Sequence, residues 1–377
     1  MYARRVALNL LLPSGNQEPS CKCLQCLRKG RPPLRARDIV GVKNNMGNNT
    51  CDNNQYTGKT DAETVQTYKK SETTSLRTLI TGGAGFIGSH LVERLLQAGH
   101  QVTVLDDLST GSLGNLENCK GAPNLTLHQV DITDHSAISP LFRDIEWVFH
   151  LAGRTEVMSS LDQPLEYHQV NVNGTLSVIE AARIAGVKRF IYTASASCYG
   201  NSVQTPTPET APVEMLHPYA LTKYLGEQYT LNWGRIYNLP CVSLRLFNVY
   251  GPRARDSGAY ASLMTIFKRQ KREQQPLTVV GDGTQTRDFI FVADVADAFV
   301  KAAESGVKGE VFNIGSGETY SVNFVAASFG GPIVHIPPRT CEPSISQADA
   351  SKAQRLLGWK FTTSIEDGIR SVMQAAG

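Results

Sequence analysis

Short apolar segments alternate with helical segments along the chain from Leu76 onward. Residues 76–81 and 101–105 have the composition of buried strands, and residues 90–99 between them carry leucines at helical spacing. Four more apolar segments, bounded by polar or glycine-rich joints, follow the same order: 125–130, 147–151, 190–194 and 242–246. Alternation of strand and helix builds a parallel sheet with helices on both faces. The pattern therefore predicts an α/β fold with a doubly wound parallel sheet.

The texture changes toward both ends of the chain. From about Gly251 the polar joints lengthen and the strands shorten, as at 277–280 and 311–314. This indicates a smaller lobe packed over the carboxyl ends of the sheet strands. We expect a sheet domain over 76–250 and a region over 251–377 that is mainly the smaller lobe, with some elements returning to the sheet. Residues 1–75 lack helical or strand periodicity, so we interpret them as a low-order extension or an inaccurate gene start.

Charge is distributed unevenly along the 377 residues. Residues 1–75 carry a net charge of +6 and the remainder −3, which together give +3. Hydrophobic residues make up 41% of the chain, enough for a sizeable core, and this excludes a chain that is disordered throughout. The slightly acidic body gives no support for a nucleic-acid surface, so we expect no nucleic-acid partner.

The eight cysteines fall into two groups of four. The first group could supply four thiolates, but zinc sites normally come as two spaced pairs, so we expect no metal. The second group is dispersed, which is typical of a reduced intracellular protein, and we expect a cytoplasmic location. The sequence has no run of 18 apolar residues, and we expect no membrane span. The groups are Cys21, Cys23, Cys26 and Cys51, and Cys119, Cys198, Cys241 and Cys341.

A glycine-rich turn follows the first expected strand. Gly83, Gly85 and Gly88 match the spacing Gly-x-Gly-x-x-Gly, and Gly82 begins a second reading of the same segment. Glycines let the backbone approach a pyrophosphate, whose charge is met by the N-terminus of the next helix. Asp106 ends the second strand, where a carboxylate accepts a hydrogen bond from an adenosine ribose and repels a 2′-phosphate. The combination predicts a binding site for NAD rather than NADP.

A possible acid/base pair lies at Tyr219 and Lys223. Their spacing of four places both side chains on one face of a helix that we expect to begin near Pro218. A neighbouring cation favours the phenolate form of tyrosine. Ser195 and Ser197 follow a strand at the edge where such sheets bind ligands. Hydroxyls at such places are commonly turn caps, but beside this pair either could hold a reacting oxygen.

Together these motifs resemble those of the extended short-chain dehydrogenase/reductases, and within them the UDP-sugar 4-epimerases. The resemblance covers residues 76–377 and implies a Rossmann-type sheet with a C-terminal substrate-binding lobe, bound NAD, a UDP-sugar substrate and a homodimer formed through helices on the flank of the sheet. It is carried by residues 81–90, 106–111, 131–132, 150–153, 171–175, 219–223 and 244–251.

The resemblance implies a role for each matching residue. Tyr219 would be the base, Lys223 would bind the nicotinamide ribose and lower the pKa of Tyr219, and Ser195 would hold the sugar hydroxyl. NAD would contact Gly82, Gly85, Phe86, Ile87, Gly88, Asp106, Asp107, Asp131, Ile132, Leu151, Ala152 and Gly153, besides Tyr219 and Lys223. The substrate would contact Ser195, Ser197, Asn248, Arg287, Arg339 and Ser346.

The kind of reaction is indicated by the segment that ends at Gly200. Related dehydratases resemble Thr-Asp-Glu there, and decarboxylating relatives keep a glutamate, whereas this chain has Ser195, Ala196 and Ser197. This favours an epimerase that removes a hydride from C4 of a UDP-hexose and returns it through a transient 4-keto sugar and bound NADH. Ser346 is small at a position where, in similar epimerases, bulk restricts the pocket, so N-acetyl sugars stay open beside plain hexoses.

Two features depart from the family pattern, and three other functions stay open. Residues 321–331 are shorter than the helix of relatives, which questions the packing of the small lobe, and Asn173-Gly-Thr175 reads formally as a glycosylation site. The alternative enzyme functions are UDP-glucuronate 4-epimerisation or reduction of a sugar nucleotide. The alternative outside enzymes is a non-catalytic NAD-binding regulator. The sequence does not identify the physiological sugar.

Overall fold

The computed structural model describes residues 75–202, 204–255, 262–338 and 343–375, all of which belong to one compact unit, Lys69–Gly377. The extension expected over 1–75, apart from Ser75, lies outside the described residues. So do the four cysteines of that extension, Arg339 and Cys341.

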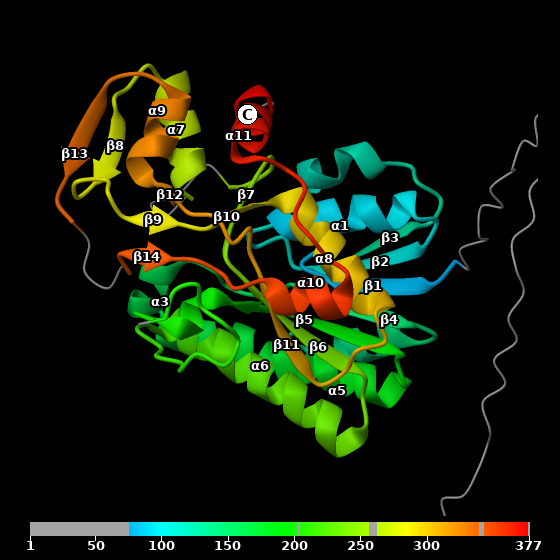
Figure 1. Cartoon of the computed structure of the whole chain (residues 1–377). Coiled ribbons are helices and arrows are strands. Elements are labelled where there is room, and N and C mark those ends of the chain that lie inside the picture. Colours follow the sequence, from blue (N-terminus) through cyan, green and yellow to red (C-terminus); the bar gives the residue numbers. More distant parts are fainter. Residues whose placement is uncertain (1–74, 203, 256–261, 339–342, 376–377) are drawn as a thin grey trace, which may run out of the picture. The chain divides into compact units, whose positions relative to one another are not determined.

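A seven-stranded parallel sheet forms the centre of this unit (Figure 1), which confirms the predicted α/β class. The strand order is β11-β6-β5-β4-β1-β2-β3. The chain leaves β1 on one side toward β2 and β3 and later returns on the other side to β4, so the order reverses between β1 and β4, where such sheets bind ligands. The strands are β1 Arg77–Thr81, β2 Gln101–Asp106, β3 Leu125–Gln129, β4 Trp147–His150, β5 Arg189–Ser195, β6 Cys241–Leu246 and β11 Glu310–Ile314.

Helices cover both faces of the sheet (Figure 1). Leu91, Leu95 and Phe299 lie in the apolar core of one face, and Val178 and Ile179 in that of the other. Strands buried on both faces read as continuous apolar runs, which is why the sequence displayed them clearly. The first face carries α1 Phe86–Gln97, α8 Val292–Glu304 and α10 Ser351–Leu357, and the second carries α2 His135–Ile138, η2 Ser139–Phe142, α5 Thr175–Ala185 and α6 Pro218–Tyr237.

Shorter elements complete the sheet half of the unit. They are the 3-10 turns η1 Leu113–Cys119 and η4 Ala196–Tyr199, the helices α3 Val157–Asp162 and α4 Pro164–His168, and the π-helical segment η3 Gln169–Gly174. Two of these elements, η3 and η4, lead into the residues of the candidate site. None of the described helices is long and apolar enough to cross a bilayer.

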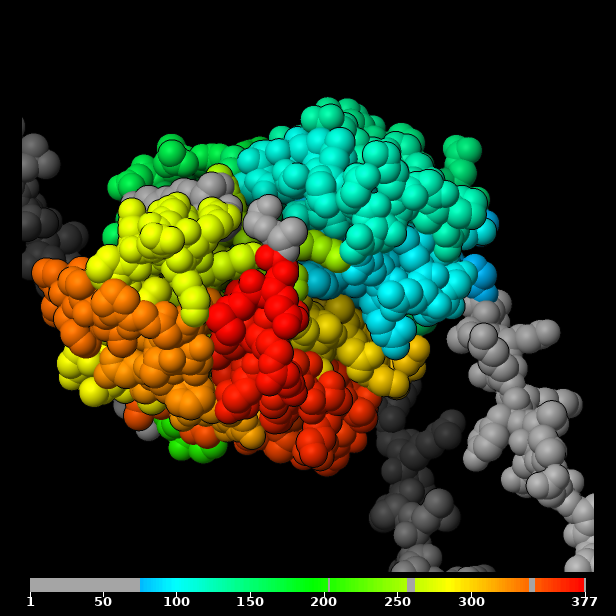
Figure 2. Space-filling model, turned by 90° about the horizontal axis from the view of Figure 1, so that it is seen from above, coloured from blue at the N-terminus to red at the C-terminus, as the bar shows by residue number. Residues whose placement is uncertain are grey.

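The smaller lobe is built from residues after β6 (Figure 1). Phe267, Phe329 and Ile369 are buried in its separate apolar core. Seen from above, α11 lies beside the other lobe helices (Figure 2) and packs on α7 and α9. The lobe contains α7 Leu263–Arg272, α9 Val322–Phe329, α11 Ile365–Gln374 and the strand pairs or groups β7 Asn248–Tyr250 with β10 Phe289–Phe291, β8 Leu277–Val280 with β13 Ile333–Ile336, and β12 Tyr320–Ser321 with β9 Thr286–Arg287 and β14 Ile345–Ser346.

Two expectations for the last third of the chain can be compared with the structure. The strand expected at 311–314 belongs to β11, which pairs with β6 and so joins the main sheet instead of the lobe. The shortened segment forms α9. Four of its side chains are buried in the lobe core, those of Val322, Val325, Ala326 and Phe329. A short helix therefore still fills its place. The boundary between the two regions at residue 250 stays a prediction.

Candidate active site

The glycine turn after β1 packs against the backbone of Leu151 and Ala152, just after β4. Gly82 has φ +73°, and a Cβ there would lie 2.7 Å from the amide nitrogen of Ala152. A Cβ on Gly88 would lie 2.0 Å from the carbonyl oxygen of Gly82. Neither position accepts a side chain, so the turn presents bare backbone at the sheet edge. Phe86 and Ile87, two of the residues expected to hold the pyrophosphate, form the first turn of α1, which contains no acidic residue.

Asp106 holds the glycine turn from the end of β2. Its carboxylate accepts hydrogen bonds from the amides of Ala84 and Leu108, each at 2.9 Å. These bonds use two of the roughly four acceptor positions of a carboxylate, which leaves positions for a ribose hydroxyl. Burial raises the pKa of Asp106 from its ordinary value, and the two amide hydrogen bonds oppose that rise. The structure thus gives Asp106 a second role, which is to fix the turn.

The other residues expected at the cofactor have different settings. Asp107 is exposed and accepts from the amide and hydroxyl of Ser109, and exposed Asp131 accepts from the amide of Thr133 at 2.8 Å. Ile132 is buried, and its side chain lies in the core beneath the second face of the sheet. Ile132 therefore has only its backbone to offer an adenine ring. Leu151 and Gly153 are partly buried after β4. Their contacts with a cofactor stay predictions.

His150 links the end of β1 to the start of α5. Its Nδ1 lies 2.7 Å from the Thr81 hydroxyl and its Nε2 lies 2.9 Å from the Thr175 hydroxyl. Thr175 donates its own proton to the carbonyl of Asn171, so it accepts from Nε2–H, and Thr81 donates to Nδ1. The amide of Ala152 then donates to Thr81. Burial lowers the pKa of His150 to about 3, so the ring stays neutral. The sequence motif contained His150 but did not reveal this role.

Asn171 ties the catalytic helix to the loop after β4. Its Oδ1 accepts from the amide of Arg154 at 2.7 Å, and its Nδ2 donates to the carbonyl of Arg154 and to the hydroxyl of Thr222. Thr222 in turn donates to the carbonyl of Tyr219. Asn171 is 1% exposed. Sequence reasoning assigned no function to Asn171 or Thr222, since only their contacts reveal one. Asn173, the residue that formally reads as a glycosylation site, is exposed and lies within η3.

The expected acid/base pair, Tyr219 and Lys223, lies at the start of α6, where a helix was predicted. The ring of His217 accepts from the amide of Ala220 and caps the helix, and Pro218 occupies its first turn, where a missing N–H costs nothing. Lys223 is 5% exposed, and its ammonium lies 4.6 Å from the centre of the Tyr192 ring. Burial lowers the pKa of Lys223 to about 7, although the charge of Glu227 opposes the shift. At neutral pH the lysine is therefore only partly protonated in the protein alone.

Ser195 connects the end of β5 to Tyr219. Its hydroxyl accepts from the amide of Ser197 at 3.2 Å and so caps η4, and its interaction with the phenol of Tyr219 favours the phenolate. The cap interpretation is confirmed, and a role of Ser195 toward a substrate stays a prediction. Burial raises the pKa of Tyr219 above its ordinary value, and the hydrogen bond from Ser195 opposes that rise. We expected Lys223 to lower this pKa. In the protein alone burial dominates, and the opposing interaction comes from Ser195.

The hydroxyl of Ser197 stands out among the described residues. Its oxygen is buried without a hydrogen-bond partner. Among the side chains of the described residues, only Thr193 Oγ1 and Arg189 Nε share this condition. Buried polar groups are normally paired, because an unmade hydrogen bond costs about 1–3 kcal/mol. Ser197 lies two residues from Ser195, which contacts Tyr219. A ligand hydroxyl at this place would satisfy it.

The residues expected at the nucleotide lie in the smaller lobe or at its border. Arg287 of β9 is the register partner of Ser346 in β14 and of Tyr320 in β12. Asn248 is exposed in β7, and its register partner Phe289 lies two residues after Arg287. The structure therefore brings Arg287 and Ser346 together and places Asn248 on β7, which pairs with β10, the strand that follows β9. Arg339 lies outside the described residues.

Comparison with known proteins decides which family these features represent. The sequence profile described as "NAD dependent epimerase/dehydratase family" matches residues 78–315. The chain belongs to this family. NAD is accordingly its cofactor.

Individual relatives match along nearly their whole length. A UDP-glucose 4-epimerase of Mycolicibacterium smegmatis is 38% identical over 309 residues, which are 79% of this chain and 98% of the relative. A solved UDP-glucose 4-epimerase of Thermotoga maritima with UDP-glucose is 34% identical, with a TM-score of 0.75, over 79% of this chain and 98% of that one. A UDP-N-acetylglucosamine 4-epimerase of Methanobrevibacter ruminantium, solved with UDP-N-acetylmuramic acid, is 30% identical, with a TM-score of 0.76, over 80% and 97%.

The described residues fit NAD by their own chemistry. The glycine turn has no room for side chains, α1 directs unpaired amides from a first turn without acids, and Asp106 keeps free acceptor positions at the end of β2. These are the features that receive a pyrophosphate and an adenosine ribose. Gly82, Gly85, Gly88 and Asp106 are thus the residues that would hold it. Bound NAD supplies reversible hydride transfer.

Gly88→Ala should destroy the cofactor site. Its Cβ would lie 2.0 Å from the Gly82 carbonyl, so the turn must move. We expect NAD affinity, measured by calorimetric titration, to fall at least about 100-fold, which is on the order of 3 kcal/mol. Gly114→Ala is the matched control, because its Cβ meets only the Ser112 hydroxyl at 3.4 Å. Unchanged NAD binding in Gly88→Ala would contradict the assignment of this turn.

Lys223→Met should stabilise the protein without cofactor while abolishing activity. The pKa of Lys223 falls from 10.5 to about 7 on folding, so the cost of burying its charge is fully present below pH 7. This cost shrinks as pH rises from about 7 toward the ordinary value, because the unfolded chain then also loses the proton. We expect urea unfolding to show a gain on the order of 3 kcal/mol at pH 7 that diminishes by pH 10. A gain independent of pH would contradict this origin.

Proposed function

We propose that this protein, an NAD-dependent isomerase of the UDP-sugar 4-epimerase type, interconverts UDP-hexoses at C4. The substrates would be UDP-glucose and UDP-galactose or their N-acetyl forms. The observation that carries the proposal is the placement of Tyr219 and the buried Lys223 one turn apart on α6, which packs against β5, the strand that ends in Ser195. The unpartnered hydroxyl of Ser197 supports it, since a sugar offers several hydroxyls to such a group.

In the proposed reaction Ser195 and Tyr219 handle the proton of the 4-hydroxyl. Tyr219 as the phenolate takes that proton while the hydrogen on C4 leaves with its electron pair, which produces a 4-keto sugar. After the sugar turns over, the hydride returns to the opposite face and Tyr219 returns the proton to the oxygen. Atoms and electrons balance within one cycle. The hydrogen bond from Ser195 favours the phenolate, and Lys223 stands nearby to stabilise it when protonated.

The absence of acids beside Ser195 supports epimerisation over elimination. Positions 196 and 197 carry alanine and serine, so neither can protonate a leaving hydroxyl. These residues therefore favour epimerisation over dehydration. UDP-glucuronate 4-epimerisation is the alternative that needs no additional acid, and the choice between it and UDP-hexoses depends on the substituent at C5. Arg287 and its register neighbour Ser346 are proposed to lie at the nucleotide and sugar, with Asn248 and Arg339 as further diphosphate ligands.

A panel of UDP-sugars tests the proposed substrate. Purified protein with NAD should interconvert UDP-glucose with UDP-galactose, or UDP-N-acetylglucosamine with UDP-N-acetylgalactosamine, as resolved by chromatography. Tyr219→Phe should reduce turnover at least about 1,000-fold, because the base is removed. NAD affinity should be retained, since the turn after β1 is untouched.

The outcomes of this panel separate the candidate functions. Conversion of UDP-glucuronate alone would replace the hexose by the alternative substrate. Accumulation of free NADH would indicate a reductase or an oxidase. Intact NAD binding with no reaction on any sugar would favour a non-catalytic regulator.

We also propose a homodimer formed by α5 and α6. These helices pack together on one flank of the sheet, where Arg183 lies over the Tyr237 ring at 4.8 Å. Large apolar side chains on them reach solvent, which is typical of an association surface. They are Ile184, Leu221, Ile236 and Tyr237, at 60%, 42%, 58% and 47% exposed.

Ile236→Glu should convert the dimer into a monomer. A charge buried against the partner's apolar surface costs several kcal/mol, enough to dissociate a dimer at micromolar concentration. Light scattering after size-exclusion chromatography measures the mass. Leu356→Glu, on α10 at the opposite face of the sheet and 41% exposed, should remain dimeric. A monomeric wild-type protein would rule out the proposed dimer.

A further inference from the structure

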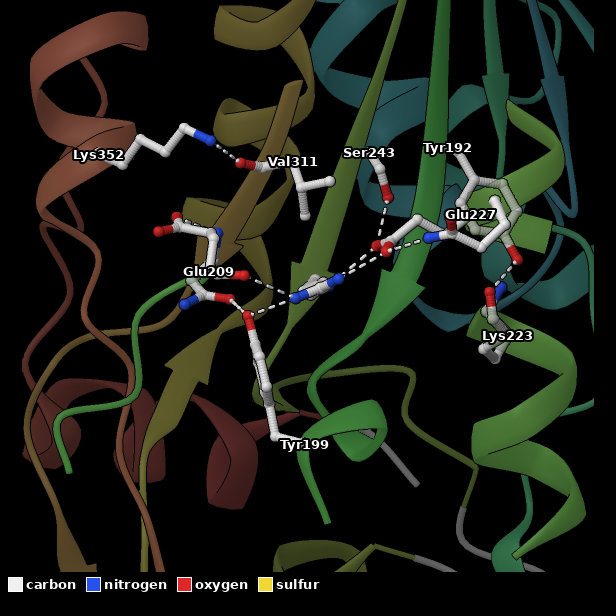
Figure 3. A network of polar contacts seen from close by, with 11 residues as sticks. Tyr192, Tyr199, Glu209, Lys223, Glu227, Ser243, Val311 and Lys352 are labelled. Atoms are coloured by element: carbon white, nitrogen blue, oxygen red, sulfur yellow. Dashed lines mark hydrogen bonds and ion pairs between the residues drawn. The ribbon is translucent and has the colours of Figure 1, made fainter. Parts of the chain in front are cut away.

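A buried ion pair lies in a network of polar contacts that includes Tyr199, Glu227 and Ser243 (Figure 3). Arg245 of β6 donates from Nε and Nη2 to the two carboxylate oxygens of Glu227 in α6, at 3.0 and 2.6 Å. The side chains are 6% and 1% exposed. Ser243 also donates to Glu227 at 3.0 Å. Glu227 follows Tyr219 by eight residues and Lys223 by four, so the three lie along one face of α6.

The other end of the same guanidinium holds the turn after β5. Nη1 of Arg245 donates to the phenol oxygen of Tyr199 at 2.8 Å and to the carbonyl of Glu209 at 3.3 Å. The guanidinium carbon also lies 4.9 Å from the centre of the Tyr199 ring. Tyr199 donates its own proton to Asn313 of β11 at 2.7 Å. Tyr199 is the last residue of η4, the turn that Ser195 caps.

Arg245 therefore joins two elements whose relative position matters for the proposed reaction. Ser195 lies at the start of the turn that ends in Tyr199, and Tyr219 lies on the helix that carries Glu227. We propose that Arg245 is a positioning residue, which clamps α6 to η4 and so fixes the Ser195 hydroxyl against the Tyr219 phenol. Tyr199 and Glu227 are the two ends of this clamp. The inference rests on the proposed function only in that the clamped pair is the catalytic one.

The energetics favour a geometric role for this pair. Burying two charges costs several kcal/mol per ion before their attraction compensates it, and apolar residues of similar volume are often as stable or more so. A planar guanidinium with donors in a fixed fork can bind a carboxylate with one edge and a phenol with another. Lysine has one ammonium on a flexible chain and cannot hold both in a fixed orientation. An arginine at position 245 is thus explained by the fixed orientation in which it holds α6 relative to η4.

The clamp should influence the titration of Tyr219 through Ser195. Burial raises the pKa of Tyr219, and the interaction of its phenol with Ser195 opposes that rise. The titratable groups around this phenol are His217, stacked at 5.9 Å, Lys223 on the same helix, Cys198 in η4, and Tyr192 in β5. None of them is changed by a substitution at Tyr199. A shift in the pH dependence of that variant therefore reports the geometry of the Ser195 contact.

The first experiment needs no substrate. Hydrogen exchange followed by mass spectrometry is compared in wild type, Tyr199→Phe and Arg245→Lys. Tyr199→Phe removes one hydroxyl and keeps the ion pair, so it should fold even where Arg245→Lys does not. We expect exchange of residues 196–199 and of the first turn of α6 to rise about tenfold in the clamp variants. Arg189→Lys is the control, because Arg189 is also a buried strand arginine, but it lies at the opposite end of β5 and donates to the carbonyl of Ala302.

The second experiment is kinetic and uses the UDP-sugar converted by wild type. Misplacing a reacting group by about 1 Å costs up to about 100-fold, so kcat of Tyr199→Phe should fall at least tenfold with KM and NAD affinity within twofold. The rising limb of kcat against pH should move to higher pH, because Tyr219 loses the interaction that favours its phenolate. Arg189→Lys should retain the wild-type kcat and pH profile.

The outcomes distinguish this inference from the proposed function. Wild type that leaves every UDP-sugar unchanged overturns the function, while the exchange data still decide the clamp. Unchanged exchange in both segments of Tyr199→Phe overturns the clamp. So does active wild type with a variant whose kcat and pH profile match it. Equal effects in Arg189→Lys would show a general loss of stability, which also overturns it.

Discussion

The site depends on one unfavourable condition, the burial of the Lys223 ammonium at the carboxyl edge of the sheet. Its ammonium faces the ring of Tyr192, and burial shifts its pKa to about 7. Burial lowers the pKa of His150, and the charge of Lys223 adds to that shift, so the imidazole stays neutral and can accept from Thr81. The negative charge of Glu227 favours the protonated form of Lys223 and raises its pKa against burial. The same carboxylate also forms the ion pair with Arg245, so these three charged side chains depend on one another.

Backbone packing supplies the second constraint. Hydrogen bonds of His150 join the end of β1 to the start of α5, and those of Asn171 join η3 to the loop after β4. Polar contacts therefore connect these closely packed segments. Groups held in this way have defined orientations, as required where a hydride and a proton must move together. The smaller lobe has its own core and carries the arginine and serine expected at the nucleotide. Each half of the site is thus stabilised by packing outside it.

Several parts of this arrangement could be predicted from the sequence for clear physical reasons. The strands of the sheet are apolar on both faces and stand out as runs, and the glycine turn and the spacing of Tyr219 and Lys223 are local signals. The network of Arg245, Glu227 and Tyr199 is not local, because its members lie 18 to 46 residues apart and meet only through the strand order. A charged residue in an otherwise apolar strand was its one visible sign. The direction of the Tyr219 pKa shift also depended on burial, which spacing does not report.

The neutral imidazole of His150 has a further meaning for solvent exchange. Both of its ring nitrogens are committed, one as acceptor from Thr81 and the other as donor to Thr175. Burial lowers the pKa of His150 to about 3, so the ring does not hold an additional proton at neutral pH. In the proposed cycle the proton taken from the sugar is the one that is given back. An isomerisation with no net change in protons needs no such store beside the site.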